Sequence, residues 1–182
     1  MDVKALAAGE KDYILAQRHW LHAHPELGRE EKETTAHIAA ELEKMGIPVQ
    51  TFPDITGCIG TIQGAKGPGK TLMLRADIDA LPIQEADLTK PYASQHPGVM
   101  HACGHDGHMA NLLTFAQWLS EHREKLRDDV VLLFQPAEET TGGARNMIEE
   151  GALEDPHVEV VYGMHMMPDV PLGKVSTCAG PM

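Results

Sequence analysis

The alternation of apolar and polar positions predicts strands that alternate with helices along this chain. Three short apolar runs, at residues 71–76, 130–134 and 158–162, each end in polar residues, which is typical of buried strands. Between the first two runs, apolar residues recur at helical spacing from Met109 to Leu119, which predicts an amphipathic helix from residue 106 to about residue 125. A shorter helix is expected over residues 143–150.

The first part of the chain predicts two further helices. Apolar residues at helical spacing indicate a helix over residues 30–45, which Gly46 and Pro48 would end. Residues 3–22 favour a helix over a strand, because Tyr13 and Trp20 lie on one helical face.

Together these elements predict an α/β fold with a mostly parallel mixed sheet covered by helices on both faces. The length of 182 residues suits one domain, and no internal repeat suggests a boundary. Residues 64–70 are expected to form a hairpin or a strand connection. In such sheets ligands bind outside the carboxyl ends of the strands. The residues that follow the predicted strands are therefore the candidates for function.

Chemically active side chains follow each of the three predicted strands. Four carboxylates and one imidazole stand there: Asp77, Asp79, Glu138, Glu139 and His165. Cys103 and His105 come just before the amphipathic helix, so the helix start and the sheet can bring them to the same place. Thiolate, imidazole and carboxylate in one cleft are the ligands of a metal site.

The adjacent glutamates suggest how such a site would work. Neighbouring residues in an extended segment point in opposite directions. One of Glu138 and Glu139 can therefore bind metal while the other faces substrate. A carboxylate beside the metals can accept a proton from the attacking water and pass it to the leaving amine. The other histidines near these motifs are interpreted as packing or supporting groups: His22, His24, His101 and His108.

Composition narrows the expected partners and compartment. The formal charge of -12 disfavours nucleic acids and anionic membranes, which select basic surfaces. The apolar runs are too short to span a bilayer, and the N-terminus lacks the apolar region of a signal peptide. Cys58, Cys103 and Cys178 are widely spaced, which favours reduced thiols over a disulfide framework. We therefore expect a cytoplasmic protein with a small-molecule substrate, no nucleic-acid partner and no membrane partner.

The sequence resembles a family of metal-dependent amidohydrolases in five motifs that follow the family's order. They are HPELGREE at 24–31, RADIDALPIQE at 75–85, MHACGHDGHM at 100–109, QPAEE at 135–139 and GMH at 163–165. The family includes hippurate hydrolases, aminoacylase-like N-acyl-amino-acid deacylases and plant auxin-conjugate hydrolases. The resemblance implies hydrolysis of the amide bond of N-acyl amino acids or short peptide-like amides.

The resemblance also assigns roles to individual residues. Four positions match metal ligands: Cys103, His105, Glu139 and His165. Glu138 matches the general acid and base, whereas Asp79 and Asp106 are expected only to orient the ligands. A complete site would hold two divalent metal ions. Its donors suit zinc, nickel, cobalt or manganese, and the sequence does not choose among them.

The family pattern continues beyond a segment similar to VSTCAGPM, which ends this sequence. The resemblance therefore implies that residues 1–182 are the N-terminal part of the catalytic domain of a dinuclear zinc-peptidase-like fold. A lid and dimerisation domain, a further histidine ligand and an oxyanion-stabilising histidine would be absent. We expect the isolated chain to be weakly active or inactive, and the full-length relatives to be homo-oligomers.

Two other interpretations stay open from the residues alone. A thiol hydrolase would use Cys103 as the nucleophile and His105 or His165 as its base, but it would leave the glutamate pair without a role. A non-catalytic metal-binding or assembly module would bind metal without hydrolysing amides.

Overall fold

A five-stranded mixed sheet lies at the centre of the computed structural model, which describes residues 3–66, 69–140 and 142–177. The strands, in the spatial order β1-β2-β4-β3-β5, are β1 (Val49–Thr51), β2 (Cys58–Ile62), β4 (Asp129–Gln135), β3 (Thr71–Asp77) and β5 (Val160–Gly163). β3 pairs in parallel with β4 and β5, whereas β2 pairs antiparallel with β1 and β4.

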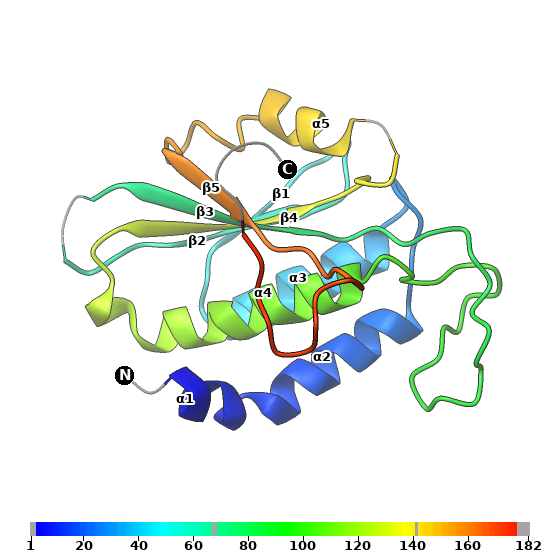
Figure 1. Ribbon diagram of the computed structural model, residues 1–182. Helices are drawn as coiled ribbons and strands as arrows, with labels where there is room; N and C mark the ends of the chain where they lie inside the picture. The colour runs from blue at the N-terminus through cyan, green and yellow to red at the C-terminus, as the bar shows by residue number, and fades with distance from the viewer. Residues whose placement is uncertain (1–2, 67–68, 141, 178–182) are drawn as a thin grey trace.

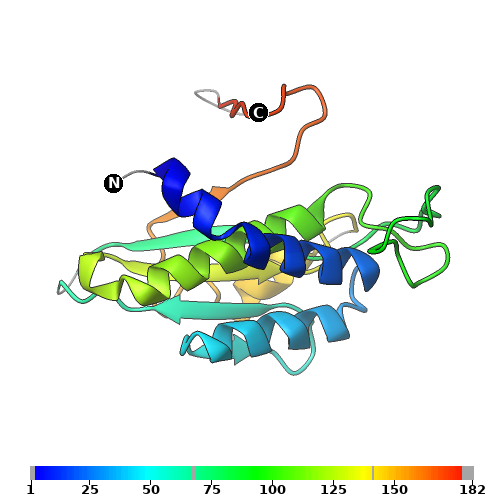
Figure 2. The same cartoon turned by 90° about the horizontal axis from the view of Figure 1, so that it is seen from below.

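Helices cover the two faces of this sheet unequally (Figure 1). They are α1 (Val3–Gly9), α2 (Lys11–Ala23), α3 (Lys32–Lys44), α4 (His105–Glu121) and α5 (Gly143–Glu149), with a short 3-10 helix at Arg123–Lys125. α3 and α4 lie against one face with α2 packed on α4, and α5 lies on the other face (Figures 1 and 2). The predicted α/β class with a mixed, helix-covered sheet is confirmed. The sheet is not mostly parallel as predicted, because β1 and β2 add antiparallel pairings, so two of the four strand pairs in the described residues are antiparallel. Among the described residues, no helix combines the length and apolarity needed to cross a membrane.

The central strand β4 supplies both halves of the core, because its side chains alternate between the two faces. Val130, Leu132 and Phe134 pack toward α3 and α4, in a cluster that includes Leu113. Val131 and Leu133 pack on the opposite face beside Met147 of α5. A strand that is buried on both faces consists of consecutive apolar residues, which explains why the sequence predicts this strand.

Several predicted elements differ in detail from the observed ones. The helix expected over 3–22 is interrupted at Glu10, and the helix expected over 106–125 ends at Glu121. β1 and β2 were not predicted. β1 has only three residues, and none of them is buried. Residues 67–68 of the expected connection lie outside the described residues. Cys58 and Cys103 are free thiols, as expected, and Cys178 lies outside the described residues.

The third predicted strand is present, but the prediction that it is buried was wrong. β5 forms an edge of the sheet, and all four of its residues are exposed. Tyr162 is 61% exposed and Val161 is 49% exposed. In the part of the chain that the structure describes, β5 pairs only with β3, so its apolar composition is not matched by burial.

A buried polar bridge ties α2 to the first turn of α4. Asp106 is 1% exposed, and its Oδ2 lies 2.8 Å from His22 Nδ1 and 3.2 Å from Arg18 Nε. His22 Nε2 lies 3.3 Å from Glu85 Oε1. Because each ring nitrogen faces a carboxylate oxygen, the arrangement favours the doubly protonated imidazolium. The hydrogen bond to Asp106 raises the pKa of His22, although burial opposes the charge. The bridge fixes the helix start that carries His105.

The buried face of α4 should contribute more to the free energy of unfolding than its exposed face. Leu113 is 0% exposed, so Leu113→Ala should lower the free energy of unfolding by about 2–5 kcal/mol through lost burial and a residual cavity. Phe115 on the same helix is 43% exposed, and Phe115→Ala should cost about 1 kcal/mol. Urea unfolding measures both. Equal losses would contradict the assignment of these two helix faces.

The contribution of the His22 bridge to the free energy of unfolding should depend on pH. The folded-state pKa of His22 is raised above the ordinary value, so its contribution to stability is full below about pH 6.5 and is lost as pH rises through the folded pKa. His22→Gln should therefore lower the free energy of unfolding more at pH 6 than at pH 9, measured by urea unfolding in a metal chelator. His157→Gln is the exposed control and should have little effect at either pH. Equal losses for His22→Gln at both pH values would show that His22 is not charged.

Candidate metal centre

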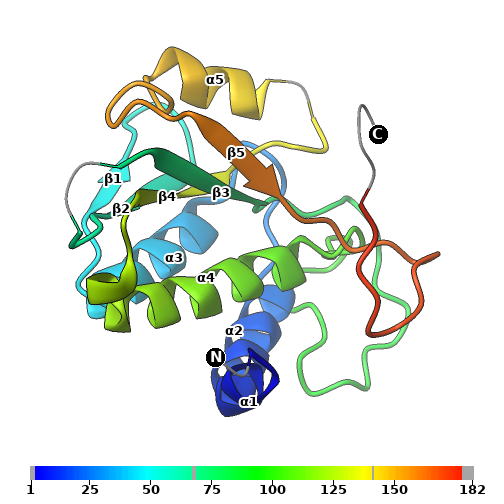
Figure 3. The ribbon, with the colours of Figure 1, turned by 60° about the vertical axis from the view of Figure 1, so that its left-hand side comes forward.

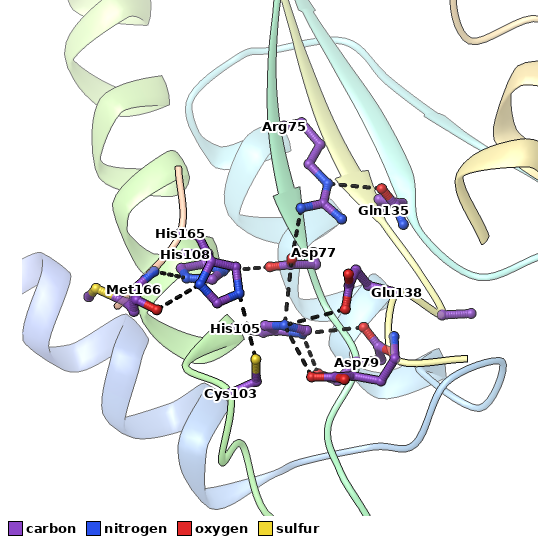
Figure 4. Close-up of polar contacts among 12 residues, drawn as sticks. Arg75, Asp77, Asp79, Cys103, His105, His108, Gln135, Glu138, His165 and Met166 are labelled. Carbon is purple, nitrogen blue, oxygen red and sulfur yellow. Dashed lines mark hydrogen bonds and ion pairs between the residues drawn. The ribbon is translucent and has the colours of Figure 1, made fainter. Parts of the chain in front are cut away.

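The sequence-predicted ligands meet at the carboxyl end of the sheet. The segments that follow β3, β4 and β5 gather there with the start of α4 (Figure 3). Cys103, His105, Glu138 and His165 converge on one region in the close-up view (Figure 4). The register places Asp77, at the end of β3, opposite Gln135, at the end of β4, so both polar segments begin at the same level.

His105 is oriented so that one ring nitrogen faces this region without a hydrogen-bond partner. Its Nδ1 lies 2.8 Å from the backbone oxygen of Asp79, and a carbonyl oxygen can only accept, so Nδ1 carries the proton. Among the described residues the buried Nε2 has no hydrogen-bond partner, and it lies 3.6 Å from Glu139 Oε1 and 3.5 Å from Asp77 Oδ2. A buried nitrogen lone pair directed at carboxylates suits a cation between them.

Cys103 and His165 complete the set of predicted ligands. His165 Nδ1 lies 2.6 Å from the backbone oxygen of Met166, which leaves its Nε2 available, 3.6 Å from Cys103 Sγ. One ligand atom each from Cys103, His105 and Glu139 lies within 4.8 Å of the others. The structure therefore brings the four predicted ligands together from three separate parts of the chain.

In the metal-free protein the ligand candidates Cys103 and His105 hold their protons tightly. Burial, together with Glu139 and Glu138, raises the pKa of the Cys103 thiol to about 12. Burial opposes charge on His105, but Asp79 and Asp77 outweigh it and raise the pKa of His105. A divalent cation would replace these protons and neutralise the carboxylates. A raised thiol pKa is the opposite of what a cysteine nucleophile needs, which disfavours the thiol-hydrolase interpretation.

Asp77 and His108 also lie at the site, although the sequence analysis gave them no specific role. His108 Nδ1 lies 2.6 Å from Asp77 Oδ1, and the Met166 N–H donates to His108 Nε2 at 2.8 Å. Arg75 Nη1 donates to Asp77 Oδ2 at 2.7 Å. One ligand atom each from Asp77, His105, His108 and His165 also lies within 4.8 Å of the others. Because hydrogen bonds already occupy both ring nitrogens of His108 and both oxygens of Asp77, a cation would have to displace them to bind this pair.

The charge on Asp77 is held firmly by the same contacts. Burial opposes the charge, but His108, His105 and Arg75 together lower the pKa of Asp77 to about 2. The sequence did carry a signal for His108, since it follows His105 by three residues and so lies on the same face of α4. Its partner could not be read from that spacing.

The two acids expected to orient ligands take different positions. Asp79 lies between two ligands, since its backbone oxygen accepts from His105 and its Oδ2 accepts from the Glu139 N–H at 2.9 Å. Asp106 turns away from the cluster and holds α2 through His22 and Arg18. It can therefore act on His105 only by fixing the start of α4.

Glu138 and Glu139 differ in exposure, as adjacent residues with different roles would. The Glu139 side chain is 23% exposed and approaches His105, whereas the Glu138 side chain is 39% exposed, with Oε2 4.0 Å from His105 Nε2. The Glu138 side chain is thus the more exposed of the two. The donor set and the buried His105 Nε2 without a hydrogen bond fit a divalent cation.

Known proteins share this sequence and fold. The chain is 46% identical to N-acetyl-L-cysteine deacetylase of Bacillus subtilis, over 97% of this chain and 41% of that protein. It is 44% identical to IAA-amino acid hydrolase ILR1-like 4 of Arabidopsis thaliana, over 94% of this chain and 38% of that protein. The crystal structure of Bacillus subtilis YXEP protein, described as a dinuclear metal binding peptidase, superposes with a TM-score of 0.87 at 42% identity, covering 98% of this chain and 48% of that one.

The match extends through the whole candidate site. The chain spans less than half the length of each of these relatives. The sequence pattern described as Peptidase family M20/M25/M40 matches residues 73–180, which include Cys103, His105, Glu139 and His165 as well as Glu138. With that match and these identities, the chain belongs to peptidase family M20/M25/M40.

Proposed function

We propose that this protein takes part in metal-dependent hydrolysis of the amide bond in N-acyl amino acids. The observation that carries the proposal is the unpaired, buried Nε2 of His105, which faces Glu139 and lies beside Glu138. Cys103 and His165 supply the further donors of the same cluster. The substrate class is supported by the relatives, whose names specify an N-acetyl amino acid and an IAA-amino acid.

The chain's own residues divide the work of such a reaction. Cys103, His105, Glu139 and His165 would hold divalent cations, two per complete site, whose identity among zinc, manganese, nickel and cobalt is open. When bound, such ions polarise a carbonyl and lower the pKa of water. Asp79 keeps His105 and Glu139 in place through its backbone oxygen and its carboxylate. These contacts leave His105 Nε2 pointing into the site (Figure 4).

Glu138 is the group that moves the proton. Its carboxylate lies close enough to the cluster to accept a proton at an oxygen and is exposed enough to pass it to the nitrogen of the leaving amine. The function therefore requires an ionised Glu138 at the start of each cycle. That residues 1–182 form the N-terminal part of a catalytic domain, and that the chain alone is weakly active or inactive, stay predictions.

Metal binding should depend on His105 and not on an exposed histidine. We expect the chain to bind zinc or manganese, and His105→Ala to weaken binding at least about 100-fold because it removes a central ligand. Isothermal titration after chelator treatment measures the affinity. His157→Ala, which changes an exposed histidine outside the cluster, should bind as the unmutated chain does. Equal affinity in the His105→Ala protein would contradict the proposed site.

Turnover should depend on Glu138 without any loss of metal. With N-acetyl-amino acids and added zinc or manganese, amine release is expected to be slow, and Glu138→Gln should lower it about 100-fold or more because the proton acceptor is lost. Metal content should stay unchanged. Glu150→Gln on the surface is the matched control. Bound metal with no amine release in the unmutated chain would fit an inactive fragment with a partial site as well as the non-catalytic metal-binding module. Full activity in Glu138→Gln would contradict the assigned role.

A further inference from the structure

The turn that carries the two glutamates contains a strained residue. Ala137 directly precedes Glu138 and adopts a φ of 51°, in the left-handed region. A residue with a Cβ pays about 1–2 kcal/mol to lie there. Such a conformation persists only where its surroundings hold it. The backbone conformation of Ala137 matters because a change there would redirect both Glu138 and Glu139.

The group that holds Ala137 comes from a distant part of the sequence. Glu31 is 0% exposed, and its Oε1 accepts a hydrogen bond from the Ala137 N–H at 2.8 Å, across a separation of 106 residues. Its Oε2 accepts from the Thr56 hydroxyl at 2.5 Å. Both oxygens of this buried carboxylate are therefore used, and one of them bonds directly to the strained residue.

Glu31 is free for this contact because another residue serves its own helix. It occupies the position before the first residue of α3, where a side chain usually caps the helix, but its carboxylate makes no capping bond. Glu26 does so instead and accepts from the Glu33 N–H at 3.1 Å and the Thr34 N–H at 2.7 Å. The Glu31 carboxylate is thus committed to the turn and not to helix α3.

Close packing leaves the turn little freedom. A Cβ on Gly143 would lie 1.8 Å from the Pro136 oxygen, and a Cβ on Gly57 would lie 2.5 Å from the Phe134 oxygen. Glycines thus let a loop, at Gly57, and the first residue of α5, Gly143, approach the backbone that leads into the turn. At the far end, Asp79 Oδ2 accepts from the Glu139 N–H. A buried carboxylate therefore holds the turn on each side of Glu138.

We propose that Glu31 is a positioning residue for the metal centre, which keeps Ala137 left-handed and so directs Glu139 toward the metal and Glu138 toward substrate. Glu31 acts through a hydrogen bond to the backbone and touches neither metal nor substrate. The inference rests on the proposed function for its consequence, but the contact itself is independent of it. An acceptor oxygen at the correct distance is required, whereas the negative charge is not.

Three substitutions of Glu31 distinguish the effect of side-chain length from the effect of its negative charge. Glu31→Gln keeps an acceptor oxygen at the same length and removes the charge. Glu31→Asp keeps the charge but is one methylene shorter, and Glu31→Met removes the acceptor. Glu26→Asp is the matched control, because it shortens the nearby carboxylate that caps α3 without touching the turn.

Two measurements are made on the 182-residue chain. Titration with Co²⁺, followed by the visible absorption of cobalt bound to thiolate and imidazole, gives the apparent metal affinity. Amide hydrogen exchange of Ala137 and Glu139, followed by NMR in the metal-free chain, reports the turn directly. Thermal unfolding of each variant shows whether it is folded.

The proposal predicts that Glu31→Asp and Glu31→Met bind Co²⁺ at least about tenfold more weakly, as for other residues that orient metal ligands. The Ala137 amide should exchange faster in both. Glu31→Gln should stay within about threefold of the unmutated chain in both measurements. Glu26→Asp should lower the unfolding temperature without changing Co²⁺ affinity.

Each contrary outcome overturns the proposal. Unchanged Co²⁺ affinity in a folded Glu31→Asp variant would show that the turn does not need this contact, and a Glu31→Gln variant as impaired as Glu31→Met would show that charge matters instead. If Glu31→Met fails to fold, the Asp and Gln variants decide. If the unmutated chain binds no Co²⁺, the proposed metal site fails, and the exchange of Ala137 alone decides the inference: unchanged exchange in Glu31→Asp overturns it.

Discussion

The hydrogen bond from His105 Nδ1 to the backbone oxygen of Asp79 is the contact on which the site depends. It joins the start of α4 to the segment after β3 and fixes which ring nitrogen faces the cluster. That nitrogen then lies among Asp77, Glu138 and Glu139, whose negative charges would repel one another in a small, partly buried space. A divalent cation relieves this repulsion, so the same geometry that is costly in the metal-free protein favours metal binding.

Buried carboxylates outside the ligand set keep this geometry in place. Asp106 secures α4 through His22, Asp77 secures His108 and the backbone beside His165, and Glu31 secures the glutamate turn. Each bonds a group from a distant part of the chain, so none needs to bind metal to affect it. The acidity of the sequence, with a formal charge of -12, therefore includes carboxylates that organise the site as well as those at the surface.

The sequence revealed the elements whose patterns are local. β4 is apolar on both faces and was visible, whereas β1 is short and unburied and was missed. β5 looked like a buried strand because Val160, Val161 and Tyr162 are apolar, but burial depends on neighbours that composition does not specify. The predicted ligands lie together because they occur in recognisable motifs at strand ends. The pairing of Asp77 with His108, and the reach of Glu31 to Ala137, depend on tertiary contacts that no spacing encodes.

The most direct test of the metal centre is crystallographic. Crystals of the chain soaked in zinc, with diffraction data collected on both sides of the zinc absorption edge, would locate the bound ions by anomalous scattering. The account predicts density between Cys103 Sγ, His105 Nε2 and the Glu139 carboxylate, with His165 Nε2 as a further ligand. Zinc bound only at other histidines, with His105 Nε2 still unpaired, would contradict it.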